Sequence, residues 1–484
     1  MQRHAHTGFG GSRVVTGLLL AVAACGEPLA PSMERHEPLV PQFGLGPVPA
    51  ILIIEDLGPY LGGSSSAANA INNANQITGW RATAQTSSVA YVWTPPGNVT
   101  DLGSLGQAPY TSVGHDINEA GVVVGAAGSH AFRWTPPGPM TQLASDLNAV
   151  VERAYAINNS GMAVGVISTA AIDYPVRWGS SSYSLLPLPQ PYQGYDVTHG
   201  QANDINDTHK IVGIWNSKRA FYWTVGPGFT ELAELPGSTR SEATAINDAG
   251  VIVGHTIVQG QPKAVRWPGH TTGAQFLGTL GGSWSRANDI NDAGVIVGTS
   301  ALTTGEMRAF RLPPNGFPEN LGLPFGAIGA EAQGINDDGH IVGRATFPNR
   351  VVHAVVWWHY VGNTYGIEAD WPQVISRSSP SPFTVALLST DEFDALQIDT
   401  GTLSVGDNVD DDARVLRSAD GALAVVERDV DGDGRADLLV SFDGAQLVAT
   451  ELRPRDGVVD LILKGALLDR SRGVYATGAV TVQQ

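Results

Sequence analysis

The sequence contains a single cysteine, Cys25, so no disulfide can form within the chain. Charged residues make up only 15% of its 484 residues, and Asp and Glu outnumber Lys and Arg by 46 to 28. The resulting net charge of −18 argues against nucleic acid as a partner, because phosphates bind to basic surfaces. Glycine, in contrast, occurs 58 times, a composition that favours a turn-rich, exported all-β protein over a helical enzyme.

Long apolar runs are also scarce. The stretch Val14–Ala24 is 11 residues long, which is too short to span a bilayer but typical of the apolar region of a signal peptide. Arg3 and Arg13 supply the positive charge that precedes such a region. We therefore predict that residues 1–24 are a signal peptide and that the protein is exported.

The end of this segment, Val22-Ala23-Ala24-Cys25, resembles the lipobox of bacterial lipoproteins. The resemblance implies cleavage before Cys25 and lipidation of Cys25, which would attach the protein to a membrane in the periplasm or on the cell surface. The alternative is an ordinary secretory signal with an incidental cysteine. Residues 25–49 follow with six prolines, a density that predicts an extended tether.

A repeated unit fills the middle of the chain. An Ile-Asn pair, followed by a turn and a short apolar strand, recurs at intervals of 46, 40, 48, 41, 44 and 45 residues. A period in the forties is typical of the blades of a β-propeller. The seven isoleucines are Ile71, Ile117, Ile157, Ile205, Ile246, Ile290 and Ile335.

Each unit predicts four short strands. In the sixth unit, for example, residues 286–290 are predicted to form the first strand, Asn291-Asp292-Ala293-Gly294 the turn, and Val295–Gly298 the second strand. The third strand alternates small and aromatic residues, and the fourth ends in Leu-Gly. Five tryptophans recur in the third strand and are expected in the blade cores: Trp93, Trp134, Trp178, Trp223 and Trp267.

The pattern Ile-Asn-Asp-x-Gly-x-Ile-Val-Gly, followed by His130-Ala131-Phe132-Arg133-Trp134, resembles the HAF-repeat family of extracellular bacterial proteins. Residues 219–221, 308–310 and 353–355 are variants of the His-Ala-Phe triplet, and residues 174–176 depart from it most. The resemblance covers about Ile51 to Tyr360. It implies export and a propeller-like fold, and little about activity.

The two ends of the repeat region are complementary. Residues 51–58 have the character of a fourth strand but precede the first unit, whereas the last unit lacks a clear fourth strand after Trp358. We therefore predict an all-β fold in which residues 50–361 form a seven-bladed β-propeller closed by the N-terminal strand. An open solenoid is the alternative, because it needs the same repeats without closure.

A second, acidic domain follows a predicted linker, residues 362–382. Residues 383–484 contain 19 Asp and Glu against 9 Lys and Arg, and strand-like runs predict a small β-sandwich-like domain. The segment 429–437, DVDGDGRAD, is similar to the calcium loops of EF-hand and dockerin repeats, whose alternating oxygen ligands surround one ion. By this resemblance Asp429, Asp431, Asp433 and Asp437 supply side chains and Arg435 a backbone carbonyl.

The loop departs from the EF-hand pattern at its twelfth position, where Val440 replaces the bidentate glutamate. Glu427, Asp443 or water is then needed to complete the ligands. Four neighbouring aspartates repel one another without a cation, which favours a structural calcium ion over the alternative of a solvated acidic turn.

Sequence motifs of catalysis are absent: the chain has no Gly-x-Ser-x-Gly elbow, phosphate-binding loop or His-Glu-x-x-His helix. The favoured hypothesis is a non-catalytic binding or scaffold protein whose propeller face meets an extracellular carbohydrate or protein. Aromatic residues outside the repeat register are candidates for that face: Trp80, Trp215, Trp284 and Tyr110. The alternative is a hydrolase or lyase acting on polysaccharide, for which the possible channel carboxylates are Asp116, Asp204, Asp289 and Asp196.

Overall fold

A computed structural model describes most of the chain from Ile51 onward, and the features predicted for residues 1–50, Cys25 included, lie outside the described residues. The description covers residues 51–483 with these gaps: 85–87, 107–110, 144, 146, 188–198, 361–363, 368, 373, 377–381, 391–392, 407–412, 416–422, 432 and 451–456.

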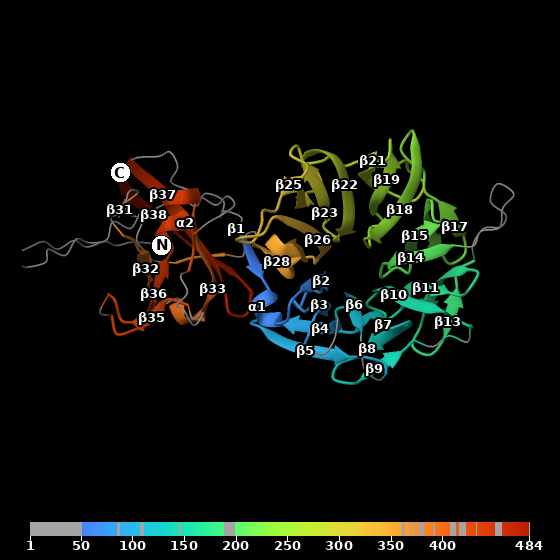
Figure 1. Cartoon of the computed structure of the whole chain (residues 1–484), viewed down its shortest axis with the longest axis horizontal. Coiled ribbons are helices and arrows are strands. Elements are labelled where there is room, and N and C mark those ends of the chain that lie inside the picture. Colours follow the sequence, from blue (N-terminus) through green and yellow to red (C-terminus); the bar gives the residue numbers. More distant parts are fainter. Residues whose placement is uncertain are drawn as a thin grey trace, which may run out of the picture. The chain divides into compact units, whose positions relative to one another are not determined.

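Seven four-stranded antiparallel sheets, numbered here as blades 1 to 7, are arranged around a central axis (Figure 1). From the axis outward, blade 1 consists of β2 (Ser66–Ile71), β3 (Ile77–Arg81), β4 (Val89–Thr94) and β5 (Asn98–Gly103). Blade 2 consists of β6 (Ser112–Ile117), β7 (Val123–Ala127), β8 (His130–Trp134) and β9 (Met140–Gln142). Blade 3 consists of β10 (Val151–Ile157), β11 (Ala163–Ser168), β12 (Asp173–Trp178) and β13 (Tyr183–Leu185).

Blades 4 to 7 repeat the order. Blade 4 consists of β14 (Gly200–Ile205), β15 (Ile211–Trp215), β16 (Arg219–Thr224) and β17 (Gly228–Glu231), and blade 5 of β18 (Ser238–Ile246), β19 (Ile252–Val258), β20 (Gln261–Trp267) and β21 (Gln275–Phe276). Blade 6 consists of β22 (Gly281–Ile290), β23 (Ile296–Leu302), β24 (Met307–Leu312) and β25 (Glu319–Asn320). Blade 7 consists of β26 (Gly329–Ile335), β27 (Ile341–Thr346), β28 (Val352–Tyr360) and β1 (Ile51–Asp56).

The N-terminal strand closes the ring, as the sequence predicts. β1 pairs antiparallel with β28, from Ile51 opposite Tyr360 to Asp56 opposite Val355, and so becomes the outer strand of blade 7. At the seam between blades 7 and 1, the Ser66 hydroxyl accepts a hydrogen bond from the Ala354 N–H at 2.9 Å. The propeller is therefore continuous across the join, and the open solenoid is wrong.

Every innermost strand carries a β-bulge at the same repeat position, two residues before the isoleucine. The bulge brings a carbonyl of the inner strand against a glycine of the second strand. A Cβ on any of these glycines would lie 1.9–2.0 Å from that oxygen. This contact explains the glycine of the Ile-Val-Gly motif: Gly79, Gly125, Gly165, Gly213, Gly254, Gly298 and Gly343.

The third strands supply the bulk of the blade cores. The five tryptophans expected there are at most 9% exposed, and the aromatic residue of the His-Ala-Phe triplet is also buried in Phe132, Phe221 and Phe310. Alternation along each strand buries these rings against one neighbouring sheet and turns the intervening residue to the opposite face, where Val92, Tyr222 and Val356 are also buried. The prediction that the recurring tryptophans pack the blades is confirmed.

Residues from 364 onward form two further sheets around one apolar core. One contains β29 (Thr364–Gly366), β31 (Val374–Ser376), β33 (Ile398–Gly406), β34 (Ala413–Arg414), β37 (Gly457–Leu467) and β38 (Gly473–Gln483); the other contains β30 (Ala369–Asp370), β32 (Phe383–Leu387), β35 (Val425–Arg428) and β36 (Asp437–Phe442). Three of these strands lie in the predicted linker 362–382, so the C-terminal sheets begin before Phe383.

Helices are few. They are α1 (Gly58–Leu61), α2 (Gly444–Thr450) and the single 3₁₀ turns η1 (Pro348–Arg350) and η2 (Ala395–Gln397). Over the part of the chain that is described, none is long and apolar enough to cross a membrane.

Candidate functional site

A closed ring of seven asparagines surrounds one end of the central channel. The side-chain amide of each repeat asparagine donates to the backbone carbonyl of the same residue in the next blade, at 2.9–3.1 Å. Its oxygen accepts the N–H four residues ahead in its own turn. Asparagine carries an N–H donor and a carbonyl acceptor on separate atoms of one short side chain, so both bonds form at once. The ring consists of Asn72, Asn118, Asn158, Asn206, Asn247, Asn291 and Asn336.

The next residue of each repeat forms a second ring at the channel mouth. Its side-chain oxygen accepts the backbone N–H of the equivalent residue in the preceding blade, at 2.7–3.1 Å. The mouth encloses a hollow of about 190 Å³. Burial raises the pKa values of Glu119 and Asp248, and neighbouring carboxylates add to the rise. The members are Asn73, Glu119, Asn159, Asp207, Asp248, Asp292 and Asp337.

Three of the four carboxylates considered for catalysis lie on the channel wall. Asp116, Asp204 and Asp289 occupy alternate blades, and each carboxylate accepts two backbone N–H groups at 2.7–2.9 Å. One N–H belongs to the isoleucine that follows the aspartate, and the other to the isoleucine of the next blade. The three side chains thus join blades 2 to 3, 4 to 5 and 6 to 7, while Asp196 lies outside the described residues.

Small residues take the same position in the other four blades, namely Ala70, Ala156, Ala245 and Gly334. Each of the three aspartates links a pair of blades, so six of the seven blades are paired and blade 1 is left over. Two small residues, Gly334 and Ala70, are therefore neighbours at the seam between blades 7 and 1. There a Cβ on Gly334 would lie 2.9 Å from the Asn69 carbonyl oxygen. The aspartates therefore act as interblade links.

These carboxylates make the stability of the propeller depend on pH. Desolvation raises the pKa of Asp116 to about 7, of Asp204 to about 6 and of Asp289 to about 8. Because the folded protein holds these protons more tightly than the unfolded chain, their stabilisation is complete below about pH 4 and is lost as the pH rises through these values. We expect the free energy of unfolding in urea to fall across this range, and Asp289→Asn to flatten the fall. An unchanged pH dependence in this variant would contradict the assignment.

The opposite end of the channel, where the innermost strands begin, is less regular. A pocket of about 360 Å³ lies there between blades 3, 4 and 5, and its lining includes Arg153, Tyr155, Gln201, Arg240 and Glu242. These five side chains come from β10, β14 and β18, which belong to three consecutive blades. Sequence reasoning missed these residues, although Tyr155 is a visible departure from the polar residues that other repeats have at this position.

The four aromatic residues expected on a binding face lie in different environments. Trp215 is only 2% exposed, and its ring packs edge to face on Phe229 with centroids 5.1 Å apart. It belongs to the core, so its prediction as a face residue is wrong. Trp80 and Trp284 are half-buried, and Tyr110 lies outside the described residues.

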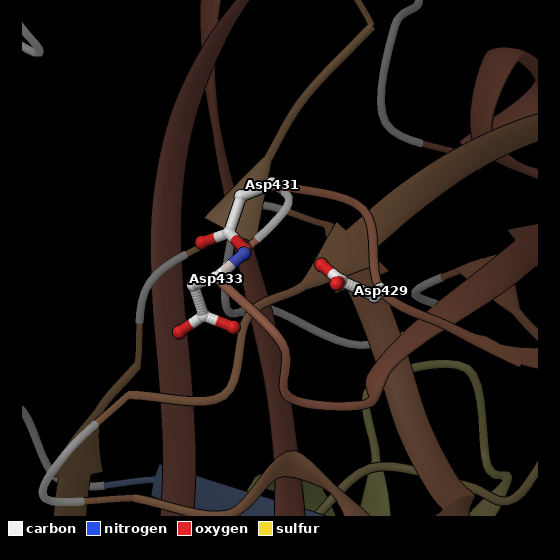
Figure 2. Close-up of side chains that lie close together, drawn as sticks. All are labelled: Asp429, Asp431 and Asp433. Atoms are coloured by element: carbon white, nitrogen blue, oxygen red, sulfur yellow. The ribbon is translucent and has the colours of Figure 1, made fainter.

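In the C-terminal domain, Asp429, Asp431 and Asp433 are exposed and face one another across a loop (Figure 2). One carboxylate oxygen from each lies within 4.8 Å of the others. Hard oxygen donors at such spacing fit Ca²⁺, which binds oxygens at about 2.3–2.6 Å. The backbone N–H of Arg435 and its guanidinium, which contacts Asp433, lower the pKa of that carboxyl. The Asp433 carboxyl therefore stays ionised near neutral pH.

The structure separates Asp437 from this cluster. Its side chain is buried, and its two oxygens accept the N–H groups of Ser389 at 2.7 Å and Val430 at 2.8 Å. Asp437 thus fixes the loop to the neighbouring strand instead of pointing toward the three exposed aspartates. Val440 is buried in β36, and Asp443 accepts the N–H groups of Ala445 and Gln446 at the start of α2.

No family model matches the chain, and no curated protein matches it in sequence. Its fold is similar to solved structures of TolB from Acinetobacter baumannii (9% identity, 61% of this chain and 64% of that chain, TM-score 0.32) and putative TolB from Agrobacterium tumefaciens (10%, 64% and 98%, 0.36). It is also similar to the BP39L lectin from Burkholderia pseudomallei (10%, 61% and 98%, 0.35). The match spans slightly less than two thirds of the first of these proteins.

Proposed function

We propose that this protein is an exported, lipid-anchored binding protein without catalytic activity, which presents one face of its propeller to an extracellular carbohydrate or protein. The difference between the two channel ends is the observation that carries the proposal. At the end formed by the Ile-Asn turns, successive blades satisfy one another in two closed rings. The opposite end has a pocket in which Tyr155 and the aliphatic residues Val151, Val166 and Ile214 stand beside charged and amide side chains, a mixture of apolar and polar groups that ligand sites use.

A hydrolase is less well supported by the channel carboxylates. A general acid or base must be within reach of the substrate and free to exchange its proton. Asp116, Asp204 and Asp289 each hold backbone N–H groups of two neighbouring blades with both oxygens. Their geometry serves the assembly of the ring.

The proposal also places a lipid on Cys25, with residues 25–49 as a tether between membrane and propeller. Membership of the HAF-repeat family is part of the same proposal and rests on the repeat residues quoted above. A screen of the intact chain against immobilised glycans and extracellular proteins tests the binding function. Specific capture supports it, and polysaccharide cleavage by the pure protein would contradict it.

Calcium in the C-terminal loop is proposed as a structural ion. Asp429, Asp431 and Asp433 would hold it, and binding to the folded state alone would stabilise that state by mass action. We expect the C-terminal transition of the intact chain to shift upward by several degrees in millimolar Ca²⁺, since extracellular modules bind it with dissociation constants of about 10⁻⁴–10⁻³ M.

The Asp431→Asn, Asp433→Asn double variant provides the control in differential scanning calorimetry. It should melt at the same temperature with Ca²⁺ or EDTA, whereas Asp394→Asn, in a different exposed turn, should keep the response. If the unaltered chain has the same melting temperature in Ca²⁺ and in EDTA, the proposal of a bound calcium ion is wrong.

A further inference from the structure

The bulge residue of the inner strand joins one blade to the next in five of the seven blades, and the described residues of blades 3 and 7 lack this link. In five blades its side chain hydrogen-bonds a backbone carbonyl of the following blade at 2.6–3.0 Å. Those five residues are Asn69, His115, Asn203, Thr244 and Asn288. In blade 7 the bulge residue, Gln333, instead bonds Glu331 of its own strand at 3.5 Å. In blade 3 the same position holds Tyr155, whose ring stacks on His115 with centroids 5.4 Å apart.

This substitution coincides with the pocket described above. Tyr155 is half-buried and lines the 360 Å³ space between its own blade and blades 4 and 5. Small-molecule sites generally enclose about 300–1,000 Å³, so the space fits a compact ligand. Blade 3 therefore has no interblade link from this position where the cavity opens. The propeller fold by itself requires neither Tyr155 nor the cavity.

Charges in the pocket are unevenly balanced. Arg240 pairs with Glu242 at 3.2 Å, and His199 lies 3.8 Å from Asp173. Arg153 donates a long bond of 3.4 Å to the Gly128 carbonyl and has no salt bridge to a carboxylate in the described parts of the chain. Its guanidinium is therefore the positive charge that a ligand can neutralise.

We infer that this pocket binds an acidic saccharide, a sugar whose ring carries a carboxylate. The guanidinium of Arg153 matches a carboxylate with two parallel N–H donors. The half-buried ring of Tyr155 offers an apolar surface for a sugar ring, and Gln201, Ser168 and Glu242 line the pocket with groups that pair with hydroxyls. The inference rests on the proposed binding function and names its ligand class.

Isothermal titration of the intact chain with uronate trisaccharides (galacturonate, mannuronate and glucuronate) and with neutral galactotriose tests the inference. At least one uronate should bind, and galactotriose should bind at least tenfold more weakly. Arg153→Gln should weaken uronate binding about tenfold or more, because hydrogen bonds between charged groups are the strongest in such sites. Tyr155→Asn, which restores the residue of other repeats, should weaken both acidic and neutral sugars.

Arg286→Gln is the matched control. Arg286 is exposed at the same position of the innermost strand in blade 6, away from the pocket, so this variant should bind as the unaltered chain does. The inference is overturned if no uronate binds, if the neutral sugar binds equally well, or if Arg153→Gln has no effect. Capture of a glycan or protein by another surface would leave the proposed function standing and remove only this site.

Discussion

A chain that begins at Gly58, and so lacks β1, is expected to aggregate instead of folding. Ile51 and Ile53 are at most 2% exposed in the closed propeller, and burial of each stabilises the fold by about 1.5–3 kcal/mol. Removing β1 also exposes the backbone of β28 as an unpaired edge, which promotes association between chains. Since domains are stable by only about 5–15 kcal/mol, these losses are comparable to the total.

Size-exclusion chromatography and circular dichroism would measure this outcome on chains that begin at Pro47 and at Gly58. The longer chain should be monomeric and the shorter one mostly aggregated. A peptide of residues 47–57, added during refolding, should restore monomer because it supplies the missing strand. A truncated chain that stays monomeric and unfolds at the same denaturant concentration would show that β1 is dispensable.

Replacing Arg470 is expected to cause the largest loss from a single side chain. Arg470 is fully buried and forms salt bridges of 2.7 Å with Glu55 of β1 and with Asp399. Its guanidinium also lies 5.8 Å from the ring centre of Trp358 in β28. Arg470→Ala leaves two enclosed carboxylates without their cation, and breaking a buried ion pair in this way costs about 3–5 kcal/mol.

Urea denaturation followed by tryptophan fluorescence measures this loss, with Trp358 as a nearby reporter. The double variant Glu55→Gln, Arg470→Met removes the charges of Glu55 and of Arg470. It should recover part of the stability that Arg470→Ala loses, because Glu55 no longer leaves an unpaired carboxylate. Arg472→Ala, two residues further on and more exposed, is the control. If Arg470→Ala unfolds at the same urea concentration as Arg472→Ala, the buried network contributes little.

Much of the fold can be predicted from the sequence because each blade repeats a local signal. The Ile-Asn turn, the alternating third strand and the spare strand at residues 51–58 are enough to give seven sheets and their closure. The interblade rings are harder to foresee. The repeat asparagine is readily explained by its turn, and only the structure shows that its amide also bonds the next blade.

The candidate sites show a similar division. Alternating aspartates predict an oxygen cluster, and three of them do face one another. Asp437 has the same spacing, but its position at the start of β36 directs it into the core, where two backbone N–H groups hold it. The pocket at Arg153 and Tyr155 is assembled from three blades. The sequence shows that Tyr155 departs from the other repeats, but the placing of Gln201 from β14 and of the charged residues from β18 beside it depends on blade packing.

Disulfide trapping between β1 and β28 tests the closed ring most directly. Leu52 of β1 lies opposite His359 of β28. The backbone N–H of His359 points away from β1 and donates to the Nδ1 of His340, so Leu52 and His359 form the close, non-hydrogen-bonded type of pair. With Cys25 replaced by serine, Leu52→Cys and His359→Cys should oxidise to a cross-link that joins the two segments in a proteolytic digest. Leu52→Cys with Thr346→Cys, which lies on the inner neighbour β27, should not. Absence of the first cross-link in folded protein would contradict the closed propeller.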